Sequence, residues 1–187
     1  IMYTGFLKLA YNGLGDLAVF IGFGPLMVYG AAYMQNQSVD PLTTLLFSIP
    51  VGIFIALVLF INCFQDYNAD KAANKNSWVV RLAGPGAKAN YRAPFKVWKN
   101  LMILSFTIIL GASLYTGNLF TLIALLPLLI FNFASKKGSS WLEQWEKEDA
   151  NLQQLPYELL IVNVSTIGIH FLTGMLLTLG FLISTWI

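Results

Sequence analysis

The chain has 187 residues, of which 57% are hydrophobic and 11% charged, and its formal net charge is +2. A soluble globular domain carries about 25% charged residues, so the composition excludes an ordinary water-soluble domain and indicates an integral membrane protein. The small net charge does not support nucleic-acid binding, and a single cysteine, Cys63, excludes a disulfide framework.

Five apolar stretches are long enough, or nearly so, to cross a membrane. About 20 mostly apolar residues suffice, and we expect helices because lipid offers backbone groups no hydrogen-bond partner. For the third and fourth stretches a buried re-entrant hairpin is the alternative, but their combined length favours two full spans. The sequence therefore predicts an all-α, polytopic membrane helix bundle with five transmembrane helices in one domain, residues 1–187. The predicted spans are residues 17–35, 41–64, 97–115, 119–134 and 159–187.

Positive charge gathers in alternate connections. Residues 1–16, 65–99 and 135–158 carry all eleven Lys and Arg residues. Five spans place these three segments on one side of the membrane, and the positive-inside rule makes that side cytoplasmic. Asp16, directly before the first span, faces the same side. It can be a helix N-cap, part of a functional site, or both.

The most informative segment lies where the second span meets the cytoplasmic surface. Asn62, Asp66 and Asp70 are spaced four residues apart, which on a helix stacks them on one face. Two carboxylates so placed repel each other, so we expect them to share a cation or a cluster of positive side chains. Carboxylate oxygens with an amide alongside suit Mg²⁺, which is commonly held by one or two carboxylates together with substrate phosphates.

Basic residues follow these carboxylates directly. Lys71, Lys75 and Arg81 are placed to contact the oxygens of a diphosphate bridged to the carboxylates by the metal. The alternative is a solvated loop whose positive charge sets topology and touches anionic lipid. We favour the solvated loop for the basic residues between 88 and 99. For Asp66 and Asp70 we favour a role in the metal–diphosphate site.

Polar residues within the last two predicted spans are interpreted as partners in helix–helix hydrogen bonds. They are Asn132, Asn163 and His170, and groups at such depth are otherwise functional candidates. Residues 141–149 combine acidic and aromatic side chains, and we expect them to form a surface helix lying at the membrane interface.

The motif from Asn62 to Asp70 resembles the second aspartate-rich motif of the UbiA superfamily of intramembrane prenyltransferases. The similarity is greatest to the dihydroxynaphthoate prenyltransferases of menaquinone synthesis, with their pattern N-N-x-R-D-x-x-x-D-x-x-x-x-K leading into V-R-L-G. Two positions depart from that pattern, with Cys63 in place of asparagine and Gln65 in place of arginine. Further matching segments are Tyr3-Thr4-Gly5, Tyr11-Asn12-Gly13-Leu14-Gly15-Asp16, Phe23-Gly24-Pro25 and residues 30–35.

The resemblance implies a function at the cytoplasmic face of the bacterial inner membrane. It implies Mg²⁺-dependent transfer of a polyprenyl group from its diphosphate to an aromatic acceptor, with dihydroxynaphthoate the leading acceptor. Asp66 and Asp70 would hold the metal and Asn62 would orient the cluster. Asp16 would help to place the acceptor. The diphosphate would be bound by Lys71, Lys75 and Arg81.

The resemblance also implies a larger protein. Members of the superfamily have about nine helices and a first aspartate-rich motif in their N-terminal half, which does not occur in this sequence. We therefore expect a C-terminal portion that holds half of the metal–diphosphate site, with a missing N-terminal half or other membrane subunits as partners. The alternative is a non-catalytic relative that serves as a structural or quinone-binding subunit of a membrane complex.

Overall fold

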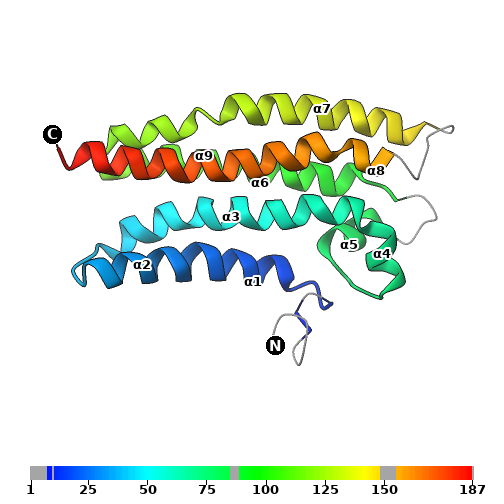
Figure 1. Ribbon diagram of the computed structural model, residues 1–187, viewed down its shortest axis with the longest axis horizontal. Helices are drawn as coiled ribbons and strands as arrows, with labels where there is room; N and C mark the ends of the chain where they lie inside the picture. The colour runs from blue at the N-terminus through cyan, green and yellow to red at the C-terminus, as the bar shows by residue number, and fades with distance from the viewer. Residues whose placement is uncertain (1–7, 10, 85–88, 148–154, 187) are drawn as a thin grey trace.

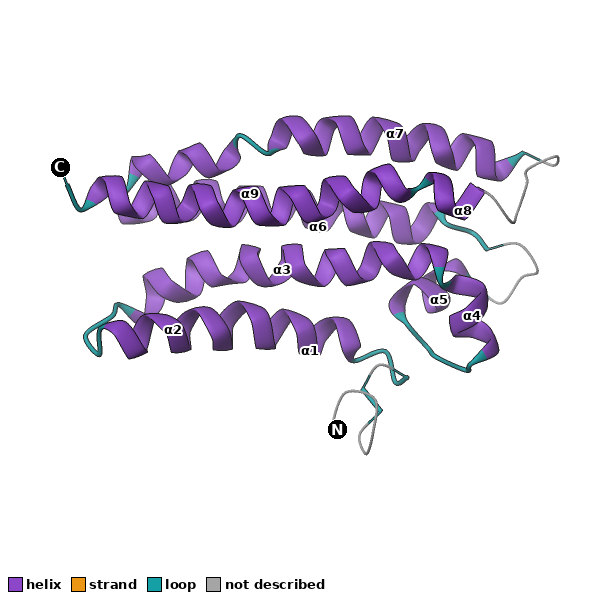
Figure 2. Ribbon diagram, viewed as in Figure 1, coloured by secondary structure: helices purple, strands orange, loops and turns teal. Residues whose placement is uncertain are grey.

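The computed structural model describes residues 8–9, 11–84, 89–147 and 155–186. In those ranges every regular element is a helix (Figure 2). Some expectations fall elsewhere: the segment Tyr3-Thr4-Gly5, Lys88, Asp149 and Ile187 lie outside the described residues. Five helical segments are long and apolar enough to cross a membrane, which confirms the predicted helix bundle. They are Gly15–Gln35, Pro41–Gln65, Arg92–Thr116, Leu119–Glu146 and Leu160–Ser184.

The chain runs back and forth along one long axis (Figure 1). Prolines mark the irregular parts of the first and fourth spans, because a proline has no N–H to continue an α-helix. Pro25 lies in a π-helical turn and Pro127 follows a 3₁₀ segment. The elements in chain order are α1 (Gly15–Ile21), η1 (Gly22–Leu26), α2 (Met27–Gln35), α3 (Pro41–Gln65), α4 (Tyr67–Ala72), α5 (Trp78–Ala83), α6 (Arg92–Thr116), η2 (Leu119–Leu125), α7 (Leu128–Glu146), α8 (Leu155–Glu158) and α9 (Leu160–Ser184).

Helix α3 is the central element of the bundle. It packs against the first span on one side and against α6 and α9 on the other (Figure 1). Asp40 caps its N-terminus, accepting a hydrogen bond from the Thr43 N–H at 2.9 Å, and hydrogen bonds from Thr43 lower the pKa of this carboxyl. Burial of large apolar side chains along α3, among them Phe54 and Ile61, holds the other helices around it.

The first span crosses α3 at a pair of glycines. A Cβ at Gly24 would lie 2.7 Å from Gly52 Cα, whereas a Cβ at Gly22 would meet nothing within 4 Å. Small residues allow this close approach between helix backbones.

We expect Gly24→Ala to lower the free energy of unfolding by about 1–3 kcal/mol, because the backbone opposite has no space to yield. Gly22→Ala is the matched control and should be neutral or slightly stabilising, since alanine favours helix more than glycine. Unfolding of both variants in detergent micelles measures the difference. Equal stability of the two variants would show that the backbones at Gly24 and Gly52 do not approach as closely as in the structure.

The charged connections meet at one end of the bundle. The beginning of α1 and helices α4, α5 and α8 lie at that end, on the right of Figure 1. The α2–α3 connection and the C-terminal end of α9 lie at the opposite end. The helices and helix ends that carry the predicted site residues therefore lie at the same end of the bundle.

Residues 141–146 are helical, as predicted for the segment 141–149, but the prediction of a surface position was wrong for the aromatic residues. Trp141 and Trp145 belong to the last turns of α7 and are buried. Both rings pack on the Tyr91 ring, whose centroid lies 5.3 Å from that of Trp141 and 4.8 Å from that of Trp145. The Trp145 indole N–H also donates to the Ala89 carbonyl at 2.7 Å. Large aromatic side chains dominate packing energetics, so the aromatic face turns inward while Glu146 stays exposed.

Candidate functional site

The predicted carboxylate motif begins at the C-terminal end of α3. The helix bends at Asp66, which separates α3 from α4. Backbone hydrogen bonds still run from the Asp66 N–H to the Asn62 carbonyl at 3.2 Å and from the Asp70 N–H to the Asp66 carbonyl at 2.7 Å. The helical hydrogen-bond pattern thus continues across the bend. However, Asn62, Asp66 and Asp70 do not lie on one continuous helix, as had been expected.

A tyrosine from the next helical connection holds this bend. The Tyr91 hydroxyl donates to the Phe64 carbonyl at 2.9 Å, and burial raises the pKa of Tyr91, so the hydroxyl stays protonated as a donor. Tyr67 adds a second tie, with its hydroxyl donating to the Gly84 carbonyl at 2.7 Å. Because these bonds reach the connection between α5 and α6, distant parts of the chain position the motif.

Asp70 and Lys75 form an ion pair inside the site. Lys75 Nζ lies 2.9 Å from Asp70 Oδ1, and the Asp70 side chain is only 8% exposed. Burial favours the neutral amine, but the hydrogen bond and charge of Asp70 outweigh it and raise the pKa of Lys75. Asp70 Oδ2 is buried without a hydrogen-bond partner among the described residues, so this carboxylate retains an oxygen for a ligand.

Asp66 and Lys71 lie on the outer side of this pair and are exposed. The Lys71 ammonium group lies 5.5 Å from the centre of the Tyr67 ring, a distance typical of a cation–π contact. These two side chains therefore face the surface, while Asp70 and Lys75 are turned into the protein.

Arg81 is bonded to the loop that precedes α1. Its Nη2 donates to the Asn12 carbonyl at 2.8 Å and its Nε to the Asn76 carbonyl at 3.1 Å. The Asn76 N–H in turn donates to the Tyr11 carbonyl at 3.1 Å. Gly13, with a φ of +68°, lies directly against the guanidinium group. Arg81 thus joins two loops distant in sequence and keeps only part of its N–H fork for other partners.

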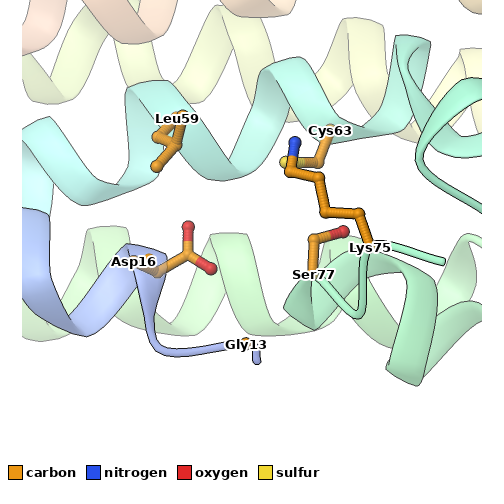
Figure 3. Close-up of a pocket in the computed structure, with 7 residues that line it drawn as sticks. Gly13, Asp16, Leu59, Cys63, Lys75 and Ser77 are labelled. Atoms are coloured by element: carbon orange, nitrogen blue, oxygen red, sulfur yellow. The ribbon is translucent and has the colours of Figure 1, made fainter. Parts of the chain in front are cut away.

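These two loops and helix α3 enclose a small pocket, which we call the polar pocket. Its volume is about 20 Å³, roughly the space for one water molecule. Figure 3 shows the Asp16 carboxylate facing the Lys75 side chain across it, with Ser77 and Cys63 beside Lys75. Sequence reasoning did not select Gly13, Ser77 or Cys63 as site residues. The lining residues are Gly13, Gly15, Asp16, Leu59, Cys63, Lys75 and Ser77.

Asp16 lies in the first turn of α1, where Leu14 rather than Asp16 is the N-cap. The side chain is half-buried, and its Oδ1 has no hydrogen-bond partner among the described residues. It lines the polar pocket together with Lys75, and Lys75 is paired with Asp70. The structure therefore groups Asp16 with Asp70 and Lys75, although they are more than fifty residues apart in sequence.

A second, larger pocket also begins at Asp16, and we call it the apolar pocket. Its volume is about 430 Å³, within the range of small-molecule sites. Apart from Asp16 its lining is apolar or aromatic, and Asp16 is the residue that lines both pockets. The lining residues are Asp16, Leu17, Phe20, Ile53, Ala56, Leu57, Phe60, Trp78, Val97 and Leu101.

Asn62 is held from the other side by α9. Asn163 Nδ2 donates to Asn62 Oδ1 at 2.8 Å, which confirms the helix–helix hydrogen bond expected for Asn163. The same expectation is not met at His170, whose Nδ1 is buried without a partner among the described residues. Asn132 is exposed on α7. Of these three polar residues, only Asn163 reaches the predicted site.

The donor set fits a magnesium ion shared with substrate. Among the described residues, no group of three or more His, Cys, Asp and Glu side chains is close enough to hold a metal. Asp70 has an oxygen without a partner and Asp66 follows Asn62 by one turn. Mg²⁺ is usually bound by one or two carboxylates, with substrate phosphates and water completing its octahedron, and this chain offers such a partial set.

Comparison with known proteins places the chain in a family. Residues 1–152 match the UbiA prenyltransferase family. The chain is 29% identical to a 2-carboxy-1,4-naphthoquinone phytyltransferase of Synechocystis sp., over 93% of the chain and 51% of the relative. It is 36% identical to a 1,4-dihydroxy-2-naphthoate octaprenyltransferase of Escherichia coli, over 70% of the chain and 41% of the relative. The equivalent enzyme of Haemophilus influenzae is 35% identical, over 74% of the chain and 45% of the relative.

The chain thus spans about half the length of the curated relatives that it matches. No solved structure matches it. The family match covers most of the sequence, including the predicted site from Asp16 to Arg81, and the helix bundle agrees with a membrane enzyme family. The chain therefore belongs to the UbiA prenyltransferase family.

Proposed function

We propose that the natural protein carrying this chain catalyses Mg²⁺-dependent transfer of a polyprenyl group from its diphosphate to an aromatic acceptor. The observation that supports the proposal is that Asp16 lines both the polar pocket, beside Lys75, and the larger apolar pocket. A polyprenyl diphosphate has the same division, with an anionic head and an apolar chain. The naphthoate and naphthoquinone prenyltransferases among the relatives favour dihydroxynaphthoate as the acceptor.

Asp66 and Asp70, with Asn62 beside them, would hold Mg²⁺, which supplies positive charge to stabilise the leaving diphosphate. Lys75 stays protonated beside Asp70 and is placed to bind a diphosphate oxygen. Lys71 would bind the diphosphate from the exposed side. The N–H groups of Arg81 that the loop carbonyls do not use would add a further contact.

The apolar pocket would bind the isoprenoid chain next to the bond that breaks. Its aromatic and aliphatic walls exclude water, which would otherwise capture an allylic cation. Asp16, which lines both pockets, would orient the acceptor. Because the relatives are about twice as long as this chain, we propose that the remaining metal ligands come from an N-terminal half outside it.

The charged end of the bundle would face the cytoplasm of a bacterial cell. The positive-inside rule supports this orientation in the inner membrane, since Lys71, Lys75 and Arg81 all belong to that end. The diphosphate substrate would then enter from the cytoplasm and the isoprenoid chain from the bilayer.

The proposal is tested with membranes from cells that produce the natural protein. We expect polyprenyl diphosphate and dihydroxynaphthoate to yield a prenylated naphthoquinol-type product, detected by mass spectrometry, and chelation of Mg²⁺ to stop its formation. Transfer to 4-hydroxybenzoate instead would retain the prenyltransferase and reject the naphthoate acceptor. Absence of any prenylated product from well-inserted protein would favour the non-catalytic quinone-binding alternative.

A further inference from the structure

The hydrogen bond between Asn163 and Asn62 links α9 to the site residues of α3. Asn163 is 3% exposed and lies in the first turns of α9, outside every motif noted in the sequence. Its Nδ2 donates to Asn62 Oδ1 at 2.8 Å. One turn further along α3, the Asp66 N–H donates to the Asn62 carbonyl, so the pair is attached directly to the carboxylate motif.

Packing alone does not account for an asparagine at this position. Asn163 Oδ1 is buried with no partner among the described residues, and a buried polar atom without a hydrogen bond destabilises the folded protein. Val162, which precedes Asn163, and Thr166, about one turn further along α9, are fully buried, so an apolar residue would pack here without that cost. The polar group therefore has a use that offsets it.

The direction of this bond determines which atoms Asn62 offers to the site. A side-chain amide has a carbonyl oxygen that accepts and an NH₂ group that donates two hydrogen bonds. The hydrogen bond from Asn163 uses one lone pair of Asn62 Oδ1, whereas both N–H groups of the Asn62 amide can still donate to a ligand. An N–H donor suits a phosphate oxygen, whereas a magnesium ion requires an oxygen.

We propose that Asn163 is a positioning residue that fixes the Asn62 amide, so that Asn62 donates a hydrogen bond to the diphosphate and does not ligate the metal. This inference rests on the proposed function, because it assigns Asn62 a partner within that site. Asn163 acts only through Asn62 and touches no substrate itself. The metal ligands proposed in this chain remain Asp66 and Asp70.

Steady-state kinetics of the natural protein test the inference with two variants. Asn163→Leu removes the hydrogen bond to Asn62 and replaces the amide with an apolar side chain of similar size. We expect it to raise KM for polyprenyl diphosphate about tenfold, equivalent to about 1.4 kcal/mol, with kcat and the half-saturating Mg²⁺ concentration nearly unchanged. Asn62→Asp keeps an acceptor for Asn163 and loses the donor. It should raise the same KM by at least as much, and the double variant should be no worse than Asn62→Asp alone.

Asn118→Leu is the matched control. Asn118 Nδ2 also donates to a residue of α9, Ser184 Oγ at 3.0 Å, and its Oδ1 is likewise buried without a partner among the described residues, but this bond lies at the opposite end of the bundle. It should lower stability with no effect on KM.

Two outcomes would overturn the inference while the wild type still transfers prenyl groups. One is an unchanged KM in Asn163→Leu. The other is a clearly raised half-saturating Mg²⁺ concentration in Asn163→Leu, which adds no charge and would therefore make Asn62 a metal ligand. Failure of the wild type to form product under any condition would instead reject the proposed function.

Discussion

Asp66→Asn is expected to reduce prenyl transfer by at least about a hundredfold, the scale seen when one charge-stabilising group is removed from an active site. Asparagine has nearly the same shape but lacks the negative charge that draws Mg²⁺ to the diphosphate. Asp66 is exposed, and substitutions at exposed positions usually change stability by less than about 0.5 kcal/mol. Expression, membrane insertion and thermal unfolding should therefore match those of the wild type.

Asp40→Asn is the matched control for this change. Asp40 is an exposed aspartate at the opposite end of α3, where it caps the helix N-terminus, and asparagine caps about as well. Product formation by both variants, measured over a range of Mg²⁺ concentrations, compares the same chemical change at two ends of one helix. Near-normal turnover by Asp66→Asn would reject Asp66 as a metal ligand.

Gly13→Ala is expected to reduce turnover by between about tenfold and a hundredfold, because small displacements of positioned groups have effects of that size. The φ of +68° is strained for alanine. A Cβ there would also lie 2.7 Å from Arg81 Cζ and 2.8 Å from the Asn76 carbonyl oxygen. Relief of both contacts moves Arg81 away from the Asn12 carbonyl, and the loop that leads into Asp16 loses its attachment.

Gly117→Ala separates backbone strain from the clash. Gly117 has a nearly identical φ of +69°, but a Cβ there meets nothing within 4 Å, and it lies between α6 and η2 at the far end of the bundle. Turnover of this variant should stay close to that of the wild type. Equal activity of Gly13→Ala and wild type would show that the contact between Arg81 and the loop does not position Asp16.

Much of the architecture could be predicted because the bilayer imposes it. A run such as residues 41–64 must be helical in lipid, and the lengths of the apolar runs limit the number of spans. The limits of the elements were less predictable. The fourth span extends to Glu146, well beyond the apolar run, because Trp141 and Trp145 find partners in Tyr91 and Phe64 that hydropathy does not reveal.

The sequence by itself determined the helix bundle and the family, and it selected the residues of the candidate site, because span length and a spaced motif are local properties of the chain. The tertiary structure alone decided which of those residues meet. It joined Asp16 to Lys75 and Asp70, bound Arg81 to the Asn12 carbonyl, and brought Asn163 to Asn62 across 101 positions. Such contacts depend on how helices distant in sequence pack together. The residue pattern within one helix does not predict which side chain of another helix will lie opposite it.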